Sequence, residues 1–202
     1  MYFTPGFIYH IYNRGNNKER IFFNEDNYIF FLYKIRQELS GYFNFLAYCL
    51  MPNHFHFLVQ VKDKPIRPLQ AVRWVENPMD PIARKVGTLL SSYTQAINKQ
   101  ENRTGSLFQQ KTKAKCLNED IESKNNYAAI CFHYIHQNPL NAGIVKKLED
   151  WKYSSFLDYA GLRNGTLCDQ KLAYEIINFS RENFIEQSYA IIDEKNLKGI
   201  WV

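Results

Sequence analysis

Two neighbouring apolar segments constrain the fold more than any other feature of the chain. Residues 42–50, YFNFLAYCL, are apolar on both faces, as expected of a central strand. Residues 54–61, HFHFLVQV, alternate between polar and apolar positions, and only Met51-Pro52-Asn53 separates the two segments. Because proline fixes a negative φ, we expect a connection slightly longer than a tight two-residue turn. The pattern predicts adjacent antiparallel strands near the centre of a sheet.

The rest of the chain supplies strands and helices in a recognisable order. Asn24 and Asp80 are suitable N-caps for two helices, and Pro139 disfavours helical backbone at the residue before it. The expected elements are strands at 7–13, 42–50, 54–61 and 107–117, and helices at 24–39, 80–101 and 118–138. We therefore predict an α+β fold with a ferredoxin-like βαββαβ core, in which an antiparallel sheet carries helices on one face.

The length and composition predict one domain with an appendage. We expect a domain at residues 1–160, with an irregular insertion at 62–80, and a helical C-terminal extension at 161–202. Hydrophobic residues make up 46% of the chain, which is incompatible with disorder, and no apolar run is long enough for a membrane span. The first residues lack a secretory signal pattern, so a cytoplasmic location is expected. The cysteines form no C-x-x-C pair and are expected to be reduced.

Two histidines are the first candidate site. His54 and His56 are two positions apart on the predicted strand, so they share one face, with Cα atoms roughly 6.5 to 7 Å apart. Two imidazoles at this separation can converge on one divalent ion. The alternative is a pair of polar positions on the less buried face of an ordinary strand. Phe55, Phe57 and Val59 should point to the opposite face, into the core.

A tyrosine and an asparagine one helical turn apart form the second candidate. Tyr134 and Asn138 are i and i+4 in the predicted third helix, so a phenol and an amide oxygen can reach the same place. Taken singly, one of 14 tyrosines is more often a packing residue than a chemical group, and Asn138 is also explained as a helix C-cap.

Several ordered blocks carry a family resemblance. The segments YHIYNRGNNKERIFF, MPNHFHFLV, GTLLSSYTQAIN, YIHQNPLNAGIV and WKYSSFLDYAG resemble the single-tyrosine HUH transposases, and especially the REP-associated tyrosine transposases, over about residues 7 to 160. The resemblance implies a metal-dependent transposase and nickase that cleaves and rejoins single-stranded DNA next to hairpins through a 5′-phosphotyrosine intermediate. It implies Tyr134 as nucleophile, His54, His56 and Asn138 as ligands, and Mg²⁺ or Mn²⁺ as the metal.

The DNA contacts are expected on the first strand, its following loop and the basic strand. The net charge of +5 permits such a polyanionic partner without requiring one. The residues expected to bind single-stranded or hairpin DNA are His10, Asn13, Arg14, Lys18, Arg20, Lys111, Lys113 and Lys115. The alternative for the lysines is a solvated strand face. The segment LFQQKTK departs from the Trp and Arg expected in the REP-associated group, which puts the hairpin specificity in doubt.

Two other function classes fit less well. A domesticated hairpin-DNA-binding protein without strand-transfer activity would not need the intact H-x-H and Tyr-x-x-x-Asn patterns. A phosphoesterase with paired H-x-[ST] motifs is disfavoured, because no such motif occurs in the sequence. The resemblance is compatible with a monomer or a homodimer, and we expect a dimer.

Overall fold

The structure is a computed structural model that describes residues 2–63, 80–118, 127–177, 179–190 and 192. Its first elements follow the predicted strand and helix order. They are β1 (Ile8–Arg14), α1 (Glu25–Glu38), β2 (Phe43–Met51), β3 (His54–Val61), α2 (Pro81–Gln100) and β4 (Lys113–Cys116). Within the described residues the strands form one four-stranded sheet in the order β2-β3-β1-β4, with every neighbouring pair antiparallel. The ferredoxin-like core is confirmed.

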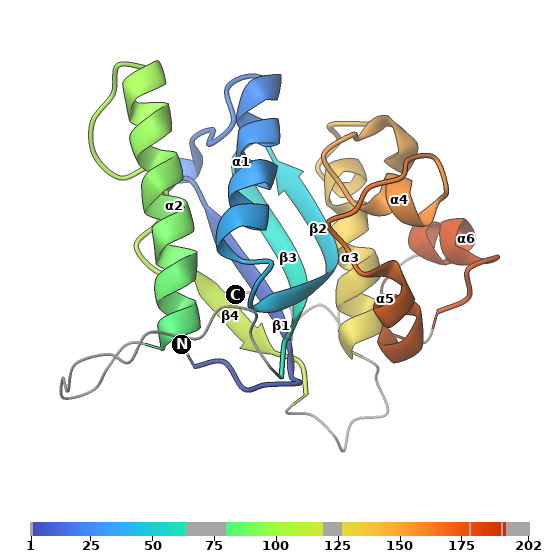
Figure 1. Ribbon diagram of the computed structural model, residues 1–202. Coiled ribbons are helices and arrows are strands. Elements are labelled where there is room, and N and C mark those ends of the chain that lie inside the picture. The colour runs from blue at the N-terminus through green and yellow to red at the C-terminus, as the bar shows by residue number, and fades with distance from the viewer. Residues whose placement is uncertain (1, 64–79, 119–126, 178, 191, 193–202) are drawn as a thin grey trace.

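One face of the sheet is covered by α1 and α2 (Figure 1). Phe55 and Phe57 of β3 are buried on this face, where the ring of Phe31 on α1 lies 5.5 Å and 6.4 Å from theirs. Asn24 caps α1 in a reciprocal capping box with Asn27, and Asp80 caps α2 by accepting from two backbone N–H groups. The predicted helix starts and the predicted core face of β3 are confirmed.

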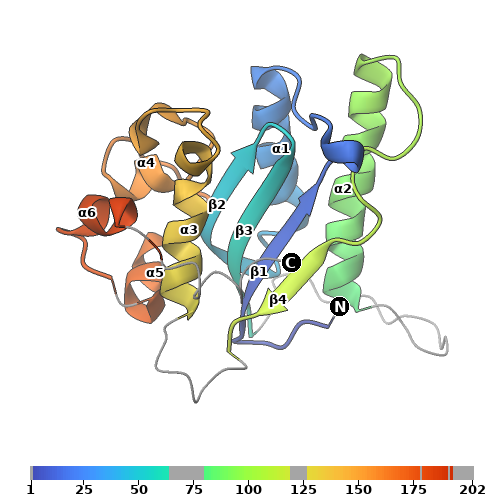
Figure 2. The same cartoon turned by 180° about the vertical axis from the view of Figure 1, so that it is seen from behind.

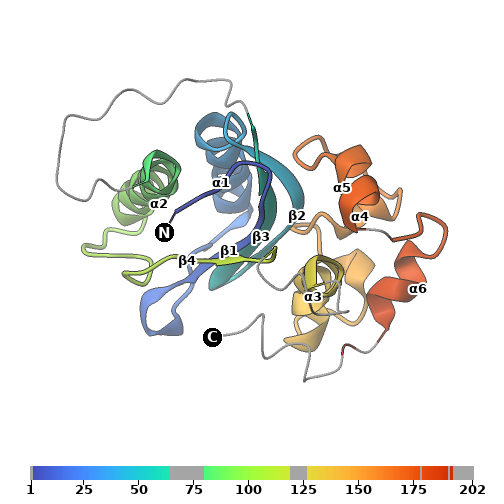
Figure 3. The ribbon, with the colours of Figure 1, turned by 90° about the horizontal axis from the view of Figure 1, so that it is seen from below.

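The opposite face carries a further helix, α3 (Tyr127–Asn141), which packs on β2 and β3 (Figure 3). In Figure 2 the strands lie in front of α1 and α2, and α3 lies beside β2. The C-terminal helices α4 (Phe156–Tyr159), α5 (Gln170–Ile177) and α6 (Phe184–Tyr189) lie on the same side as α3. Helices therefore cover part of both faces, and the described part of the C-terminal extension contains the helices α5 and α6.

The turn between β2 and β3 differs from the prediction. Met51 pairs with His54, so Pro52 and Asn53 alone make the connection, and the expectation of a longer loop was wrong. Neither turn residue has a positive φ. The turn is held from outside, because the Pro52 carbonyl accepts from Ile21 N–H at 2.8 Å and the Asn53 carbonyl from Gly15 N–H at 2.8 Å.

Other predicted ends of strands and helices also differ from those in the structure. The strand expected from residue 107 begins at Lys113, because the buried Phe108 makes only an isolated bridge to Gly15. Asn118 is not helical; its side-chain oxygen accepts from Ile8 N–H at 2.6 Å. At its other end α3 continues through Pro139 to Asn141 and so passes the expected end at Asn138, although Pro139 has no N–H to donate to the preceding turn.

The predicted insertion at 62–80 and the first residues of the expected third helix fall mostly at 64–79 and 119–126, outside the described residues. The four cysteines are free thiols, as expected. None of the helices in the described part of the chain is long and apolar enough to cross a membrane.

Candidate active site

The histidine pair lies on the face of β3 that α3 approaches. The two rings are 5.0 Å apart and nearly perpendicular, at 89°. His54, at the start of the strand, is partly exposed, whereas His56 is 2% exposed because α3 packs above it. The predicted alternation along β3 thus places both imidazoles together on one side of the sheet.

Helix α3 brings the tyrosine and the asparagine to these histidines. The Tyr134 ring lies 5.7 Å from the His56 ring, and its hydroxyl donates to Asn138 Oδ1 at 3.4 Å. The Asn138 side chain also interacts with His54. The four residues predicted from two distant segments therefore lie side by side, and both members on α3 are buried.

The orientation of Asn138 follows from its own helix. Its Nδ2 donates to the Tyr134 carbonyl oxygen at 2.9 Å, one turn earlier in α3. Since the amide nitrogen is held there, Oδ1 points toward the Tyr134 hydroxyl. An oxygen acceptor, and not an N–H donor, is therefore presented beside the histidines.

Burial sets the protonation states of the site. It lowers the pKa of His54 and His56 below the usual value, so both imidazoles are neutral at pH 7. The interaction with Asn138 opposes this change at His54 without reversing it. Burial also raises the pKa of Tyr134, so the phenol keeps its proton at neutral pH. Neutral imidazoles are the form that binds metal ions.

Each histidine has a hydrogen-bond partner at its Nδ1 atom. His54 Nδ1 lies 2.6 Å from Asn53 Oδ1, and His56 Nδ1 lies 2.9 Å from His10 Nε2. We expected His10 to contact DNA, but it is 1% exposed and lies against His56 inside the protein. Burial and the nearby Lys115 lower the pKa of His10 to about 3.

A cavity of about 280 Å³ opens beside the histidines on the same face of the sheet. The predicted DNA-binding residues among its lining residues are Asn13, Arg14, Lys18, Lys111 and Lys113. Tyr12, Asn53 and Gln109 also line it, and none of these was predicted. The four cations are exposed, so they can approach a polyanion at the cavity.

Arg20 and Lys115 are not among the residues that line this cavity, whereas Asn13 lines it as a buried residue. Arg20 lines a separate hollow together with Glu19, Phe23, Glu101 and Arg103. Lys115 pairs with His10 across β1 and β4 and is partly buried. Asn13 is buried and donates to Thr112 Oγ1 at 2.9 Å and to the Gln109 carbonyl at 3.1 Å, so its side chain joins β1 to the segment before β4.

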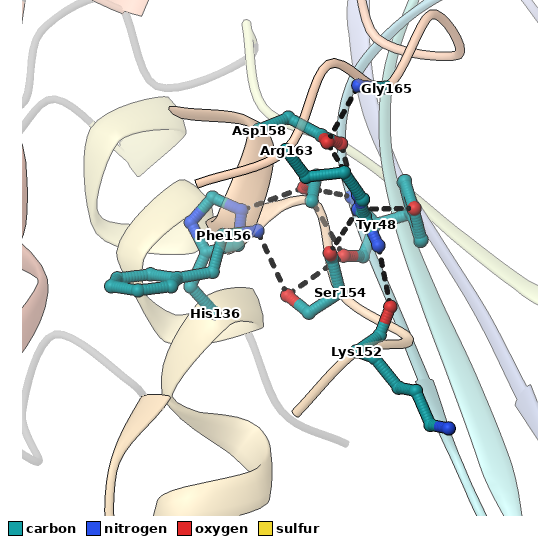
Figure 4. A network of polar contacts seen from close by, with 9 residues as sticks. Tyr48, His136, Lys152, Ser154, Phe156, Asp158, Arg163 and Gly165 are labelled. Atoms are coloured by element: carbon teal, nitrogen blue, oxygen red, sulfur yellow. Dashed lines mark hydrogen bonds and ion pairs between the residues drawn. The ribbon is translucent and has the colours of Figure 1, made fainter. Parts of the chain in front are cut away.

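A polar network fixes α3 to the edge of the sheet (Figure 4). The Ser155 hydroxyl lies 2.7 Å from His136 Nε2 on α3 and accepts from Tyr48 N–H on β2 at 2.9 Å. Arg163 donates to both oxygens of the buried Asp158, at 2.6 and 2.8 Å, and to the Tyr48 hydroxyl at 2.9 Å. These bonds hold the segment after α3 between that helix and β2.

No family model matches the chain. A protein of Haemophilus influenzae whose curated description names it a REP-associated tyrosine transposase is 24% identical over 123 residues, covering 56% of this chain. The chain spans 59% of that relative's length. A solved structure described as a REP-associated tyrosine transposase bound to a REP hairpin has a TM-score of 0.55 and 16% identity, covering 84% of this chain and 92% of that one.

The fold and the grouped residues define an α+β domain in which a buried helix presents a tyrosine to a pair of histidines on a ferredoxin-like sheet. The chain is similar in sequence to one protein described as a REP-associated tyrosine transposase, and similar in fold to a solved structure with the same description.

Proposed function

We propose that this protein is a metal-dependent transposase and nickase that cleaves and rejoins single-stranded DNA next to hairpins. The observation that carries the proposal is the position of Tyr134, which faces His56 and Asn138 beside a cavity lined by four cations. The structural neighbour is described as bound to a REP hairpin, which supports hairpin DNA as the partner.

The donor set fits a hard divalent ion such as Mg²⁺ or Mn²⁺. His54, His56 and Asn138 would hold it through two neutral imidazoles and an amide oxygen. Among the described residues no group of three or more His, Cys, Asp or Glu side chains could hold a metal, so a fully protein-made cage is absent from this part of the chain. An incomplete set suits an ion that keeps positions for water and phosphate oxygens. When bound, the ion would stabilise the charge that develops on the scissile phosphate.

Tyr134 is the nucleophile of the proposed reaction. Its oxygen attacks phosphorus, the bond from phosphorus to the 3′ oxygen breaks, and the 3′ oxygen takes up a proton. The products are a 5′-phosphotyrosine and a free 3′-hydroxyl. Attack by another 3′-hydroxyl reverses these steps and rejoins a strand without ATP. Asn138 orients the phenol through its Oδ1, and the phenolic proton is lost as attack proceeds, because burial raises the pKa of Tyr134.

The cavity cations would hold the DNA backbone. Arg14 and Lys18 approach from β1 and its loop, Lys113 from the neighbouring β4, and Lys111 from the segment just before β4. Phosphate contacts of this kind fix the position of a strand without reading its sequence. We propose this set, without His10 and Arg20, as the main DNA grip. A cytoplasmic dimer remains the prediction for location and assembly, and light scattering that gives the mass of a single chain would contradict the dimer.

A covalent-adduct assay tests the function. We expect a labelled hairpin with a single-stranded flank to form a denaturation-resistant adduct with the protein in Mn²⁺. Tyr134→Phe should abolish the adduct, and His54→Ala and His56→Ala should each lose the metal-dependent formation of the adduct. Tyr33→Phe, on the exposed face of α1, is the matched control and should leave the adduct unchanged.

Two outcomes would contradict the proposal. An undiminished adduct in Tyr134→Phe would remove the nucleophile assignment. Hairpin binding by the wild-type protein, with no adduct in Mg²⁺ or Mn²⁺, would instead favour a hairpin-binding protein without strand-transfer activity.

A further inference from the structure

We propose that Asn53 and His10 are positioning residues that hold His54 and His56 by their Nδ1 atoms and so direct Nε2 of each imidazole to the metal. The inference rests on the proposed function for the metal itself. Its central observation is the hydrogen bonding of the two histidines, in which each Nδ1 lies within 2.9 Å of a separate partner.

The Asn53 bond determines the tautomer of His54. Asn53 Nδ2 donates at 3.2 Å to the carbonyl of Lys18, which can only accept. The other end of the amide, Oδ1, is therefore the atom 2.6 Å from His54 Nδ1. An amide oxygen can only accept, so Nδ1 carries the proton. In a neutral imidazole with its proton on Nδ1, the lone pair is on Nε2, the nitrogen that a metal would use.

The loop that supplies the Lys18 carbonyl is itself firmly placed. Asn17 and Lys18 have positive φ values of 52° and 61°, which side-chain-bearing residues rarely adopt. Gly15 N–H bonds the Asn53 carbonyl, and Asn16 N–H bonds the Leu107 carbonyl at 3.0 Å. One residue, Lys18, thus orients a metal ligand through its carbonyl and lines the DNA-facing cavity with its side chain.

His10 plays the corresponding part for His56. Their rings are nearly coplanar, at 20°, and His10 Nε2 lies 2.9 Å from His56 Nδ1. In a hydrogen bond between two neutral imidazoles, one of the two facing nitrogens donates and the other accepts. A metal bound at Nε2 of His56 requires the proton on Nδ1, and His10 Nε2 is placed to accept it. Partners of this kind fix the ring and the tautomer of a metal-binding histidine.

The first test reads the tautomers directly. In the metal-free wild-type protein, ¹⁵N NMR of the histidine side chains should show His54 with its proton on Nδ1. Asn53→Ala should give a mixture of both tautomers, and Asn53→Asp, which keeps an acceptor at this place, should retain the wild-type form.

The second test measures metal binding by calorimetry with Mn²⁺ alone. Asn53→Ala should weaken the affinity by about 10- to 100-fold. The matched control is Asn16→Ala, which removes a hydrogen bond from the same loop to the Ser106 carbonyl without touching His54, and it should bind as the wild type does. Because His10 is buried, His10→Leu is compared with His10→Gln, which offers an acceptor near the original Nε2. The glutamine variant should bind Mn²⁺ more tightly than the leucine variant at equal thermal stability.

The outcomes separate the two proposals. A proton on Nε2 of His54 in the wild type, or unchanged Mn²⁺ affinity in Asn53→Ala, would overturn the positioning role while leaving the Tyr134 adduct intact. Failure of the wild-type protein to bind Mn²⁺ would overturn the proposed function, and the tautomer of His54 would still decide whether Asn53 holds it.

Discussion

Gly15 occupies a position where the backbone leaves no room for a side chain. A Cβ there would lie 2.2 Å from the Glu19 carbonyl oxygen and 3.1 Å from the Ile21 side chain. Gly87, in the middle of α2, is the opposite case, because nothing lies within 4 Å of an added Cβ. The loop that carries Lys18 depends on the first glycine, whereas α2 gains nothing from the second.

We therefore predict opposite effects for the two alanine substitutions. Gly15→Ala forces the backbone of the loop to move, which should lower the free energy of unfolding by about 1 to 3 kcal/mol. It should also weaken hairpin binding, because Lys18 lies in that loop. Gly87→Ala should raise the free energy of unfolding by about 0.5 to 1 kcal/mol, because alanine favours helix over glycine. Urea unfolding measures both free energies. If Gly15→Ala raised the free energy of unfolding as much as Gly87→Ala does, the backbone at Gly15 would have to relax freely.

At the scale of single residues, local periodicity predicted each of the two residue pairs, and the family resemblance predicted that the pairs form one site. The two-residue repeat of a strand places His54 beside His56, and the helical turn places Tyr134 beside Asn138. His10 was misinterpreted because its burial beside His56 depends on how β1 pairs with β3. In that pairing Tyr12 lies directly opposite His56, and His10 is two residues from Tyr12 on the same strand. Asn53 was interpreted only as a turn residue, although its position next to His54 was a usable signal.

Among elements, the centres were predictable and the ends were not. The strand predicted at 107–117 is reduced to β4, because Phe108 is buried in the core and bridges only to Gly15. This tertiary contact leaves no recognisable pattern in the local sequence. Helix α3 passes Pro139 to end at Asn141, so the local preference of the residue before a proline is outweighed by the packing of the helix on β2. The packing of α3 on β2 also depends on the segment around Arg163, which follows α3 and is far from β2 in the sequence.

Loss of Arg163 tests that attachment. Asp158 has a side chain that is 1% exposed, and Arg163 is the cation that pairs with it. Arg163→Met leaves a buried carboxylate without its cation, so we expect the free energy of unfolding to fall by about 3 to 5 kcal/mol. Adding Asp158→Asn should recover part of this loss, because the buried charge is then gone.

The control for Arg163→Met lies in the same segment. Lys152 forms an exposed ion pair with Glu25, and exposed pairs contribute little to stability. Lys152→Ala should leave the denaturation midpoint unchanged. A similar small effect for Arg163→Met would mean that the network does not secure α3 to the sheet.

On the scale of the whole molecule, all five histidines are held neutral by burial. Two of them, His133 and His136, lie on α3 outside the candidate site and contact hydroxyl groups, Ser188 at 3.0 Å and Ser155 at 2.7 Å. Desolvation is the largest cause of the lowered pKa in every case. The site and the helix that carries Tyr134 thus share one electrostatic requirement, that their imidazoles stay unprotonated.

This requirement makes the metal-free protein sensitive to acid. An unfolded histidine binds a proton below about pH 6.5, whereas the folded His133 does so only below a pKa of about 4. Between these values the unfolded state binds more protons, so stability is present above pH 6.5 and is lost as the pH falls toward 4. From pH 7 to 5 the loss is about 2 kcal/mol for each histidine whose folded pKa lies below 5. Summed over several, it approaches the total stability of a typical domain, about 5 to 15 kcal/mol.

Thermal unfolding can be measured in a series of buffers from pH 7.5 to pH 5 at roughly constant ionic strength. We expect the Tm to fall steeply as the pH drops below the pKa of an unfolded histidine, about 6.5. His133→Gln is the matched variant, since it removes one titrating group outside the metal site while keeping a side chain that can bond Ser188. Its stability should depend less steeply on pH, by about one proton over this range. A Tm that is the same at both ends of the series would mean that the imidazoles accept protons without unfolding, and that the buried cluster around Tyr134 opens to water more readily than its packing implies.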